Sequence, residues 1–229
     1  MSVPSITPAS ALRPLVIWGG SGLAKALREF ASALGYEVVA VFDNNPNARP
    51  PFAGVPLHHG KEGFAKWKAG FGGPPLAGWV AIGGGNARGR ERLALQRYMK
   101  EQGVEIVPAV HPTAFVAKDA VLGKGCQVLA QAAVCTEVRL GDGCIIQTAA
   151  SVDHESAMGD GVNLSPGVRI AGCVEVGSFT QFGVGAVVLP RVKIGSNAVI
   201  GAGALVTADV PDNAVMEGSP ARIVGQSGE

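Results

Sequence analysis

The amino-acid sequence predicts a small parallel α/β domain followed by a parallel β-helix. Apolar residues recur at every sixth position from Val116 to Val206 without a break, which is the main signal for the second part. Before this repeat, short apolar strands alternate with helical segments, and glycines stand at several strand ends. Such alternation is typical of a parallel sheet covered by helices.

The six-residue repeat is too short for a helical unit and fits one short strand plus a turn. Three repeats close a triangular coil of eighteen residues, so this stretch forms a little over five stacked coils. The residues two positions before each large apolar residue are small or β-branched, as the corners of such a prism require. The large apolar positions are Val116, Leu122, Val128, Val134, Leu140, Ile146, Val152, Met158, Leu164, Ile170, Val176, Phe182, Val188, Ile194, Ile200 and Val206.

The first part of the chain contains four predicted strands, which are Leu15–Trp18, Glu37–Phe42, Trp79–Ile82 and Val104–Val107. A helix with one apolar face follows the first strand and ends at Gly35, because glycine is the usual residue after a helix C-terminus. A charged helix follows the third strand and runs to about Gln102. The boundary between the two domains is expected near 108–111.

The first strand runs into the sequence Gly19-Gly20-Ser21-Gly22, a turn that leads into a helix. A glycine-rich turn of this kind exposes backbone N–H groups at a helix N-terminus, which attracts phosphate. Asp43 and Asn44 follow the second strand and Gly83 follows the third, so all these residues lie beyond strand carboxyl ends, where open α/β sheets bind ligands. The alternative is a tight turn with an ordinary capping aspartate.

One hexad differs from the others in composition, Ser151-Val152-Asp153-His154-Glu155-Ser156. It places an imidazole between two carboxylates, and a carboxylate beside a histidine orients it and favours its action as a general base near neutral pH. His154 is therefore a candidate catalytic residue. The alternative is a solvated turn, since turns of such repeats often carry charged residues.

The composition excludes several classes of protein. The formal net charge is +1 with 16% charged residues, so a nucleic-acid partner is not expected. No apolar run reaches the length of a membrane span, and the N-terminus lacks a basic segment followed by an apolar one. The four cysteines are interpreted as small core residues in a reducing cytoplasm rather than as metal or redox sites, with Cys126 and Cys144 stacked in one inward corner.

The whole chain resembles the sialic acid O-acetyltransferase and nucleotide-amino-sugar N-acetyltransferase family, bacterial sugar acetyltransferases with hexapeptide repeats. The similar segments are 16–22, 41–44, 81–83, 111–114, 151–155 and the close of the chain at 218–222. This resemblance implies a Rossmann-like nucleotide-sugar-binding domain over residues 12–108 and a left-handed parallel β-helix acetyltransferase domain over residues 109–225. It also implies a cytoplasmic homotrimer with active sites between subunits, which acts in bacterial surface glycan synthesis.

The resemblance further implies a role for particular residues. His154 matches the general base of a direct transfer from acetyl-CoA, with no metal, and Glu155 matches the acid that strengthens this base. The nucleotide-sugar contacts are implied at Ser21, Gly22, Leu23, Asp43, Asn44 and Gly83. The acetyl-CoA contacts are implied at Asn163, Val184 and Ala202.

The sequence departs from the family pattern at three of its positions. Leu23 and Asn163 each stand where many members have histidine, and Gln147 stands where asparagine is frequent. These departures concern the acceptor and some contacts, whereas the base is retained. The base of the nucleotide (UDP, GDP or dTDP), the sugar and the acetylated position are left open.

The function predicted is acetyl-CoA-dependent N-acetylation of the amino group of a nucleotide-linked amino sugar. The first alternative is O-acetylation of a sialic acid or related sugar by the same base. The second is a non-catalytic nucleotide-binding scaffold. A metal-dependent carbonic anhydrase on the same prism is disfavoured because it needs three histidines, and a nicotinamide dehydrogenase because the third glycine of the dinucleotide fingerprint is replaced by Lys25.

Overall fold

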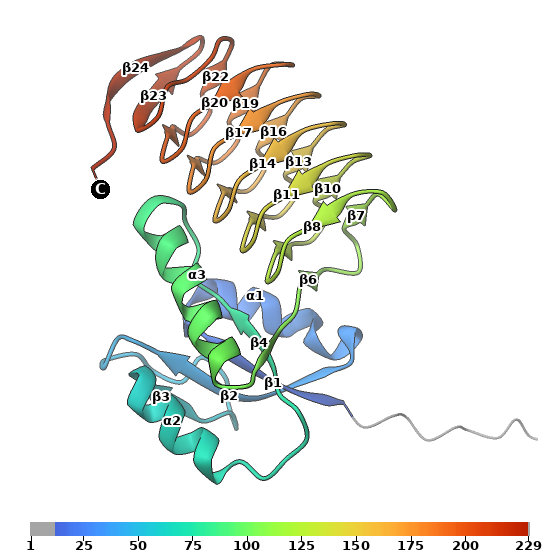
Figure 1. Ribbon diagram of the computed structural model, residues 1–229, viewed down its shortest axis with the longest axis vertical. Helices are drawn as coiled ribbons and strands as arrows, with labels where there is room; N and C mark the ends of the chain where they lie inside the picture. Colours follow the sequence, from blue (N-terminus) through green and yellow to red (C-terminus); the bar gives the residue numbers. More distant parts are fainter. Residues whose placement is uncertain (1–11, 229) are drawn as a thin grey trace, which may run out of the picture.

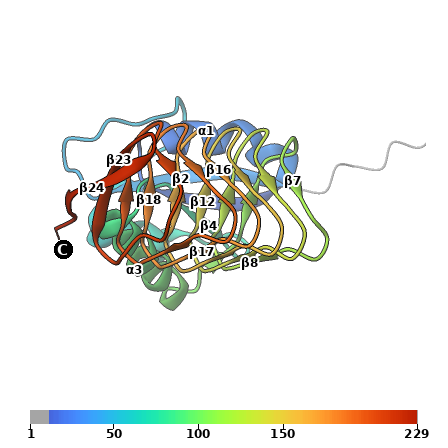
Figure 2. The ribbon, with the colours of Figure 1, turned by 90° about the horizontal axis from the view of Figure 1, so that it is seen from above.

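The computed structural model describes residues 12–228. The chain forms an α/β domain, and a parallel β-helix then stacks coil upon coil away from it (Figure 1). The same stack seen from above runs from the coil of β7 to the hairpin β23–β24 at the C-terminal end (Figure 2). The two-part architecture expected from the sequence is therefore present.

The α/β domain is a five-stranded parallel sheet of order β3-β2-β1-β4-β5. Its strands are β1 (Arg13–Trp18), β2 (Tyr36–Asp43), β3 (Leu57–His59), β4 (Ala77–Val80) and β5 (Glu105–Ile106), and its helices are α1 (Gly22–Ala31), α2 (Gly60–Gly70) and α3 (Asn86–Glu101). A short 3₁₀ turn, Ser32–Leu34, extends α1 and ends at Gly35 with a φ of 82°. The helix end predicted at Gly35 is confirmed.

Alternate residues of β1 supply two separate cores, because successive side chains of a strand point to opposite faces. Leu15 and Ile17 pack with α1 on one face. Val16 and Trp18 pack on the other face with α2 and α3. The sheet is thus covered by packed side chains on both faces.

The predicted third strand, Trp79–Ile82, starts and ends two residues later than the strand in the structure, β4 (Ala77–Val80). The strand β4 begins at Ala77 and pairs Gly78 with Val16, and it ends at Val80. Gly78 is required there because the methyl groups of Met99 and Val104 occupy the space that a Cβ would fill. The chain leaves the sheet after Ala81, whose N–H still bonds to the carbonyl of Trp18.

The β-helix consists of two-residue strands that form three parallel sheets, one on each face of a triangular prism. The β6 face, to which the C-terminal hairpin is added, contains β6 (Ala109–Val110), β9 (Gln127–Val128), β12 (Ile145–Ile146), β15 (Asn163–Leu164), β18 (Gln181–Phe182), β21 (Val199–Ile200), β23 (Ala214–Gly218) and β24 (Ala221–Gln226). The β7 face contains β7 (Phe115–Val116), β10 (Ala133–Val134), β13 (Ser151–Val152), β16 (Arg169–Ile170), β19 (Val187–Val188) and β22 (Leu205–Val206). The β8 face contains β8 (Val121–Leu122), β11 (Arg139–Leu140), β14 (Ala157–Met158), β17 (Glu175–Val176) and β20 (Lys193–Ile194).

Turns join these faces at three edges, named here after the strands they connect. The β6–β7 edge, the β7–β8 edge and the β8–β6 edge recur once in every coil. Residues eighteen apart are register partners, as in the pairing of Val134 with Val152. The large residue of nearly every hexad is buried in one continuous core, which confirms the inward orientation predicted from the repeat.

The turns of the β8–β6 edge use glycines in the left-handed region, Gly125, Gly143 and Gly161, with φ near 64°. An aspartate ladder also ties these turns together. Asp142 accepts a hydrogen bond from the N–H of Lys124 at 2.8 Å, and Asp160 accepts one from the N–H of Asp142 at 2.8 Å. These Gly-Asp turns therefore also connect one coil to the next.

The α/β domain is fastened to the β6 face and to the β8–β6 edge. The buried guanidinium of Arg92 donates hydrogen bonds to the carbonyls of Ile82 and Gly84 on one side, and of Gly143 and Gly161 on the other. Burial lowers the pKa of Arg92 to about 10. None of the hydrogen bonds between the two domains within residues 12–228 reaches the β7–β8 edge.

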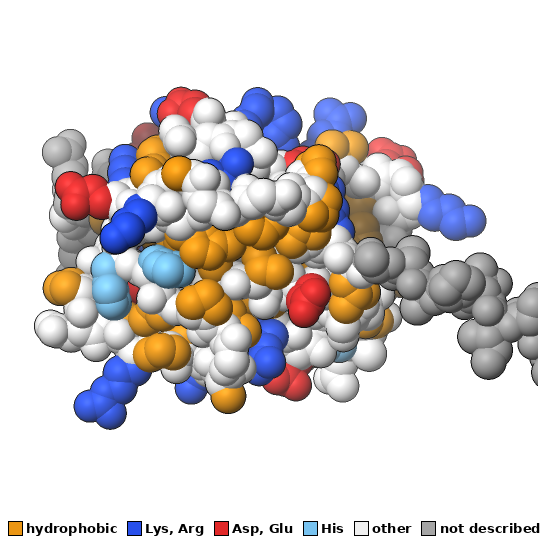
Figure 3. All heavy atoms as spheres, turned by 90° about the horizontal axis from the view of Figure 1, so that it is seen from below, with side chains coloured by type: hydrophobic (Ala, Val, Ile, Leu, Met, Phe, Trp, Pro, Cys, Tyr) orange, Lys and Arg blue, Asp and Glu red, His pale blue; other side chains and the backbone are white. Residues whose placement is uncertain are grey.

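Viewed from the side of the α/β domain, hydrophobic side chains gather in the middle of the face and charged side chains of both signs surround them (Figure 3). This distribution agrees with the near-zero net charge of the sequence. Within the described residues, no helix has the length and the apolar character needed to cross a membrane.

Candidate active site

His154 lies at the β7–β8 edge, in the turn between β13 and β14. Its backbone N–H donates to the Asp153 carboxylate at 2.8 Å, which fixes the turn. The ring atom Nδ1 lies 3.0 Å from Oε2 of Glu155, and 49% of the imidazole side chain is exposed. Glu155 reaches this position because its backbone is left-handed, with a φ of 58°.

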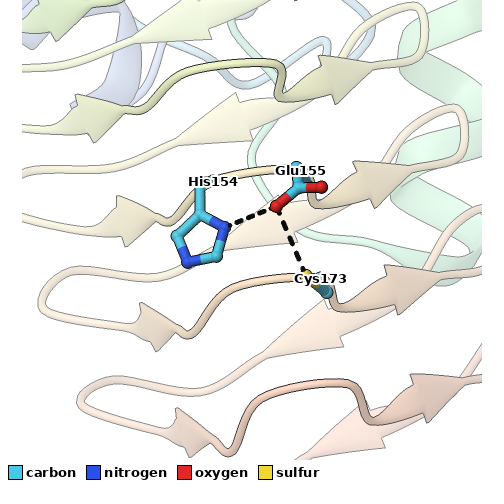
Figure 4. Close-up of side chains that lie close together, drawn as sticks. All are labelled: His154, Glu155 and Cys173. Atoms are coloured by element: carbon cyan, nitrogen blue, oxygen red, sulfur yellow. Dashed lines mark hydrogen bonds and ion pairs between the residues drawn. The ribbon is translucent and has the colours of Figure 1, made fainter.

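The hydrogen bond to Glu155 determines which ring nitrogen is available for chemistry. A carboxylate accepts, so Nδ1 carries a proton, and in the neutral imidazole Nε2 is the nitrogen with the lone pair. Nε2 points away from Glu155 (Figure 4). The arrangement therefore presents an oriented proton acceptor at the prism edge, with Glu155 behind it.

The next coil supplies the surface beneath this imidazole. Gly172 stands one coil beyond His154, and a Cβ at this glycine would overlap Nε2 and Cε1 of the ring. The thiol of Cys173, one coil beyond Glu155, lies 3.7 Å from the same Oε2 that binds His154 (Figure 4). Imidazole, carboxylate and thiol are donors that zinc accepts, and their ligand atoms lie within 4.8 Å of one another. To bind an ion, Nδ1 of His154 and Oε2 of Glu155 would both have to face it, but these two atoms are already joined to each other by a hydrogen bond.

The prediction that all four cysteines are core residues is wrong for two of them. Cys126 and Cys144 are fully buried in the prism, as predicted. Cys135 and Cys173 are only half-buried, because they occupy turn positions of the β7–β8 edge rather than inward corners. Burial raises the pKa of the Cys135 thiol, and the neighbouring charge of Asp153 raises it further.

The glycine turn lies at the carboxyl edge of the α/β sheet and is braced by Asp43. The Asp43 carboxylate accepts from the N–H of Gly20 at 2.6 Å and from the N–H of Asn45 at 2.8 Å. Both oxygens of Asp43 are thus engaged within the turn. Ser21 is the N-cap of α1 and makes no side-chain cap, and the first turn of α1 contains no acidic residue. The helix N-terminus at Gly22 and Leu23 therefore remains favourable for an anion.

A cavity of about 380 Å³ opens beside this turn, a volume within the usual range for small-molecule sites. Its wall includes Ser21, Asp43, Asn44, Ile82, Arg88 and Glu91. Three of these were predicted as nucleotide-sugar contacts. Arg88 and Glu91, both exposed residues of α3, were not predicted, because one-dimensional sequence does not distinguish the face of α3 that meets the cavity.

Asn163 is placed at the domain junction. Its side-chain oxygen accepts from the N–H of Gly84 and from Nε2 of Gln147, each at 3.2 Å. Asn163 is buried, and its Nδ2 has no hydrogen-bond partner among the described residues. Asn163, on the β6 face, therefore lies beside Gly84 and joins it to Gln147, the first residue after β12.

Val184 and Ala202 lie at the β6–β7 edge, one coil apart. The N–H of Gly203 bonds to the carbonyl of Val184 at 2.8 Å, which stacks the two turns. Val184 is 58% exposed. The structure thus brings Ser21, Asp43 and Asn44 together in one cavity and joins Asn163 to Gly84. Within one chain it leaves His154–Glu155 and Val184–Ala202 on two separate edges of the prism.

Comparison with known proteins gives a consistent result. Residues 173–208 match the family model for the bacterial transferase hexapeptide (six repeats). The chain is 36% identical to a variant of perosamine N-acetyltransferase from Caulobacter crescentus, solved in complex with CoA and GDP-perosamine, in which a histidine is replaced by asparagine. That alignment covers 95% of this chain and 100% of the other, with a TM-score of 0.84.

Two further solved structures are similar over almost the whole chain. The acetyltransferase domain of PglB from Neisseria gonorrhoeae, in complex with acetyl coenzyme A, is 28% identical, with 93% of this chain and 100% of that chain covered and a TM-score of 0.80. WeeI from Acinetobacter baumannii shares the fold at 21% identity, with 93% and 100% coverage and a TM-score of 0.79. No curated protein sequence matched. The predicted fold class, a Rossmann-like sheet followed by a left-handed parallel β-helix, is confirmed.

Proposed function

Because the chain belongs to the nucleotide-amino-sugar N-acetyltransferases with hexapeptide repeats, we propose that His154 is the general base with which it acetylates its acceptor. The enzyme is an acetyl-CoA-dependent acetyltransferase, and it N-acetylates a nucleotide-linked amino sugar. GDP-perosamine, bound by the similar Caulobacter enzyme, is the first acceptor to assay. The observation that supports His154 is its imidazole, held at Nδ1 by Glu155 and open at Nε2.

The reaction follows from this geometry. Nε2 of His154 takes a proton from the sugar amine while the amine nitrogen attacks the thioester carbonyl carbon. A C–N bond forms, the C–S bond breaks, and the departing sulfur of coenzyme A takes the proton back from the imidazolium. The Glu155 carboxylate stabilises the imidazolium that exists between these steps. No metal and no covalent enzyme intermediate take part in this proposal.

The three groups of site residues support a homotrimer with active sites between subunits. Within one chain the cavity lies on the side of the β6 face, His154 lies at the β7–β8 edge, and Val184 and Ala202 lie at the β6–β7 edge. The whole width of the β7 face separates His154 from Val184 and Ala202. A neighbouring prism would bring a second copy's β6–β7 edge and α/β domain against His154. We assign acetyl-CoA to this groove, with Val184 and Ala202 in contact with it.

Asn163 is proposed to act on the acceptor side as well as near acetyl-CoA. It links Gln147 to Gly84, next to Gly83, and so positions the backbone that faces the nucleotide sugar. The departures from the family at Gln147 and Asn163 thus fall in one hydrogen-bonded pair. The proposed setting is the cytoplasm, where acetyl-CoA is available, and the product serves bacterial surface glycan synthesis.

The test is acetyl transfer by the wild-type enzyme and by His154→Asn and His154→Ala. Release of free thiol from acetyl-CoA is measured with a panel of UDP-, GDP- and dTDP-linked amino sugars. Loss of the base lowers kcat by about 10²–10⁴-fold. His111→Asn, which removes a histidine from the first turn of the β-helix, is the matched control and keeps activity within about threefold of wild type. A folded His154 variant that loses less than tenfold refutes the assignment.

The two alternatives predict different results in the same assay. An O-acetyltransferase turns over hydroxyl acceptors such as sialic acids and not the amino sugars. A scaffold binds nucleotide without thiol release and is indifferent to substitution of His154. The N-acetyltransferase is favoured because the similar Caulobacter enzyme is an N-acetyltransferase crystallised with an amino-sugar nucleotide.

A further inference from the structure

A chain of hydrogen bonds fixes an amide and a carboxylate on the wall of the cavity beside the glycine turn. The indole N–H of the buried Trp18 donates to Oδ1 of Asn44 at 3.2 Å. An indole nitrogen can only donate, so the oxygen of Asn44 must face it and the amide nitrogen must face the other way. That nitrogen donates to Oε1 of Glu91 at 3.0 Å.

Glu91 is left with an unused acceptor. Its Oε1 is engaged by Asn44, whereas Oε2 has no hydrogen-bond partner and the carboxylate makes no ion pair within residues 12–228. The side chain is exposed and lines the cavity together with Asn44. A carboxylate held in this way can only accept hydrogen bonds, so it selects a ligand edge with N–H donors.

Arg88 indicates how a nucleotide would lie in the cavity. It stands three residues before Glu91, so the two side chains lie on one face of α3, and both line the cavity. The Arg88 guanidinium makes no ion pair among the described residues. Arg88 lines the cavity together with Ser21, which belongs to the glycine turn before α1. A diphosphate is attracted to Arg88 and to the α1 N-terminus, and the negative Glu91 repels it. The other carboxylate of the wall, Asp43, already accepts hydrogen bonds with both oxygens, from the N–H groups of Gly20 and Asn45. The nucleobase therefore belongs at the Asn44–Glu91 end.

We propose that Glu91, oriented by Asn44, selects guanine as the base of the nucleotide-sugar acceptor. Guanine presents two adjacent donors on its Watson–Crick edge, the N1–H and the 2-amino group, and edge hydrogen bonds of this kind are how proteins identify an unpaired base. The free oxygen of Glu91 accepts from this pair. Uracil and thymine offer one N–H flanked by two carbonyl oxygens, which the carboxylate repels. This inference rests on the proposed nucleotide-sugar acceptor and adds the residue that distinguishes its base.

The experiment measures binding of GDP, IDP and UDP to the full-length protein by isothermal titration calorimetry. IDP differs from GDP only by lacking the 2-amino group. The wild-type protein binds GDP about 10- to 100-fold more tightly than IDP, as expected for a hydrogen bond to a charged acceptor, and binds UDP more weakly than GDP. Glu91→Gln keeps an oxygen for Asn44 but presents an amide N–H₂ to the base, so GDP weakens to the level of IDP.

Glu101→Gln, an exposed glutamate on the same helix, is the matched control and leaves the ratio of GDP to IDP affinity unchanged. A Glu91→Gln variant that keeps the wild-type ratio overturns the proposal, and so does a wild-type protein that binds all three diphosphates equally or none of them. These outcomes need no acetyl transfer. Thiol release with amino sugars on every base, without preference for GDP, would retain the proposed function and reject only the role of Glu91.

Discussion

Gly172 has no Cβ, and this leaves the space in which the imidazole of the proposed base, His154, lies. The imidazole of His154 occupies the place where a Cβ at this position would lie. The φ of Gly172 is not among the positive values found in the chain, so alanine is compatible with the backbone. Substitution here therefore acts on the imidazole and not on the fold.

Gly172→Ala is expected to lower kcat by about 10-fold or more, because misplacement of a reacting group by about 1 Å is costly in rate. The unfolding free energy should change by less than about 1 kcal/mol, since half of the imidazole side chain is exposed and the ring can turn toward solvent. Thiol-release kinetics and urea denaturation measure the two effects. Gly225→Ala, a glycine with open space around it, should leave both unchanged, and equal kcat in the two variants would contradict the role of Gly172.

The sequence alone singles out the proposed base, but it does not single out the residues of α3 that line the cavity. His154 and Glu155 stand out because the hexad repeat defines what a purely structural turn looks like. Arg88 and Glu91 belong to a helix rich in charges, of which Arg92 is fully buried and the other two are exposed. Only the packing of α3 against both domains distinguishes the charge that holds the fold, Arg92, from the charges that line the cavity.

At the scale of elements, α3 is the connection between the two domains. Its Arg92 donates to four backbone carbonyls, two from each domain. The bonds to Gly143 and Gly161 are buried. Removing the guanidinium leaves those two carbonyls without a donor, and an unsatisfied buried acceptor costs about 1–3 kcal/mol. The helix therefore holds the carboxyl edge of the α/β sheet at a fixed position relative to the prism.

Arg92→Met is expected to destabilise the protein by about 2–4 kcal/mol, measured by chemical denaturation. Burial lowers the pKa of Arg92 to about 10, below its value in the unfolded chain. The cost of burying the charge is therefore fully present at neutral pH and is relieved only as the pH rises through 10. The destabilisation should be constant between pH 6 and 9. Arg97→Met, at an exposed position of the same helix, should cost less than about 0.5 kcal/mol, and a similar loss in both variants would refute the connecting role.

The elements of the β-helix were predictable because one pattern repeats in every coil, whereas those of the α/β domain depended on local features. The strand β4 begins at Ala77-Gly78, residues with little preference for strands, and it forms because Met99 and Val104 pack over Gly78. The strand β3 and the helix α2 have no clear sequence signal, since α2 contains glycine at both ends and within it. Their formation depends on packing against β2.

At the scale of the whole molecule, the cavity, His154–Glu155 and Val184–Ala202 lie on separate parts of one chain. The proposed mechanism therefore requires the proposed homotrimer, and this requirement can be tested. Leu189 is informative because it follows β19 at the β7–β8 edge, two coils beyond Asp153 in the same row of turns. It is 40% exposed although apolar, and it lines a shallow cavity of about 330 Å³ with Asp153 and Ala171. An apolar surface of this kind next to the base is what a second subunit would cover.

Leu189→Glu should therefore dissociate the proposed trimer, because a buried and unpaired carboxylate opposes association. Analytical ultracentrifugation at micromolar protein should show three times the monomer mass for the wild type and a shift toward the monomer for the variant. Activity should fall in parallel by more than about 10-fold and recover as protein concentration rises, since the missing element is the neighbour's groove and not the base. Leu12→Glu, an exposed leucine of the α/β domain, should remain trimeric and active. A monomeric variant with full activity would mean that one chain suffices, and that Val184 and Ala202 do not meet the acetyl-CoA used by His154.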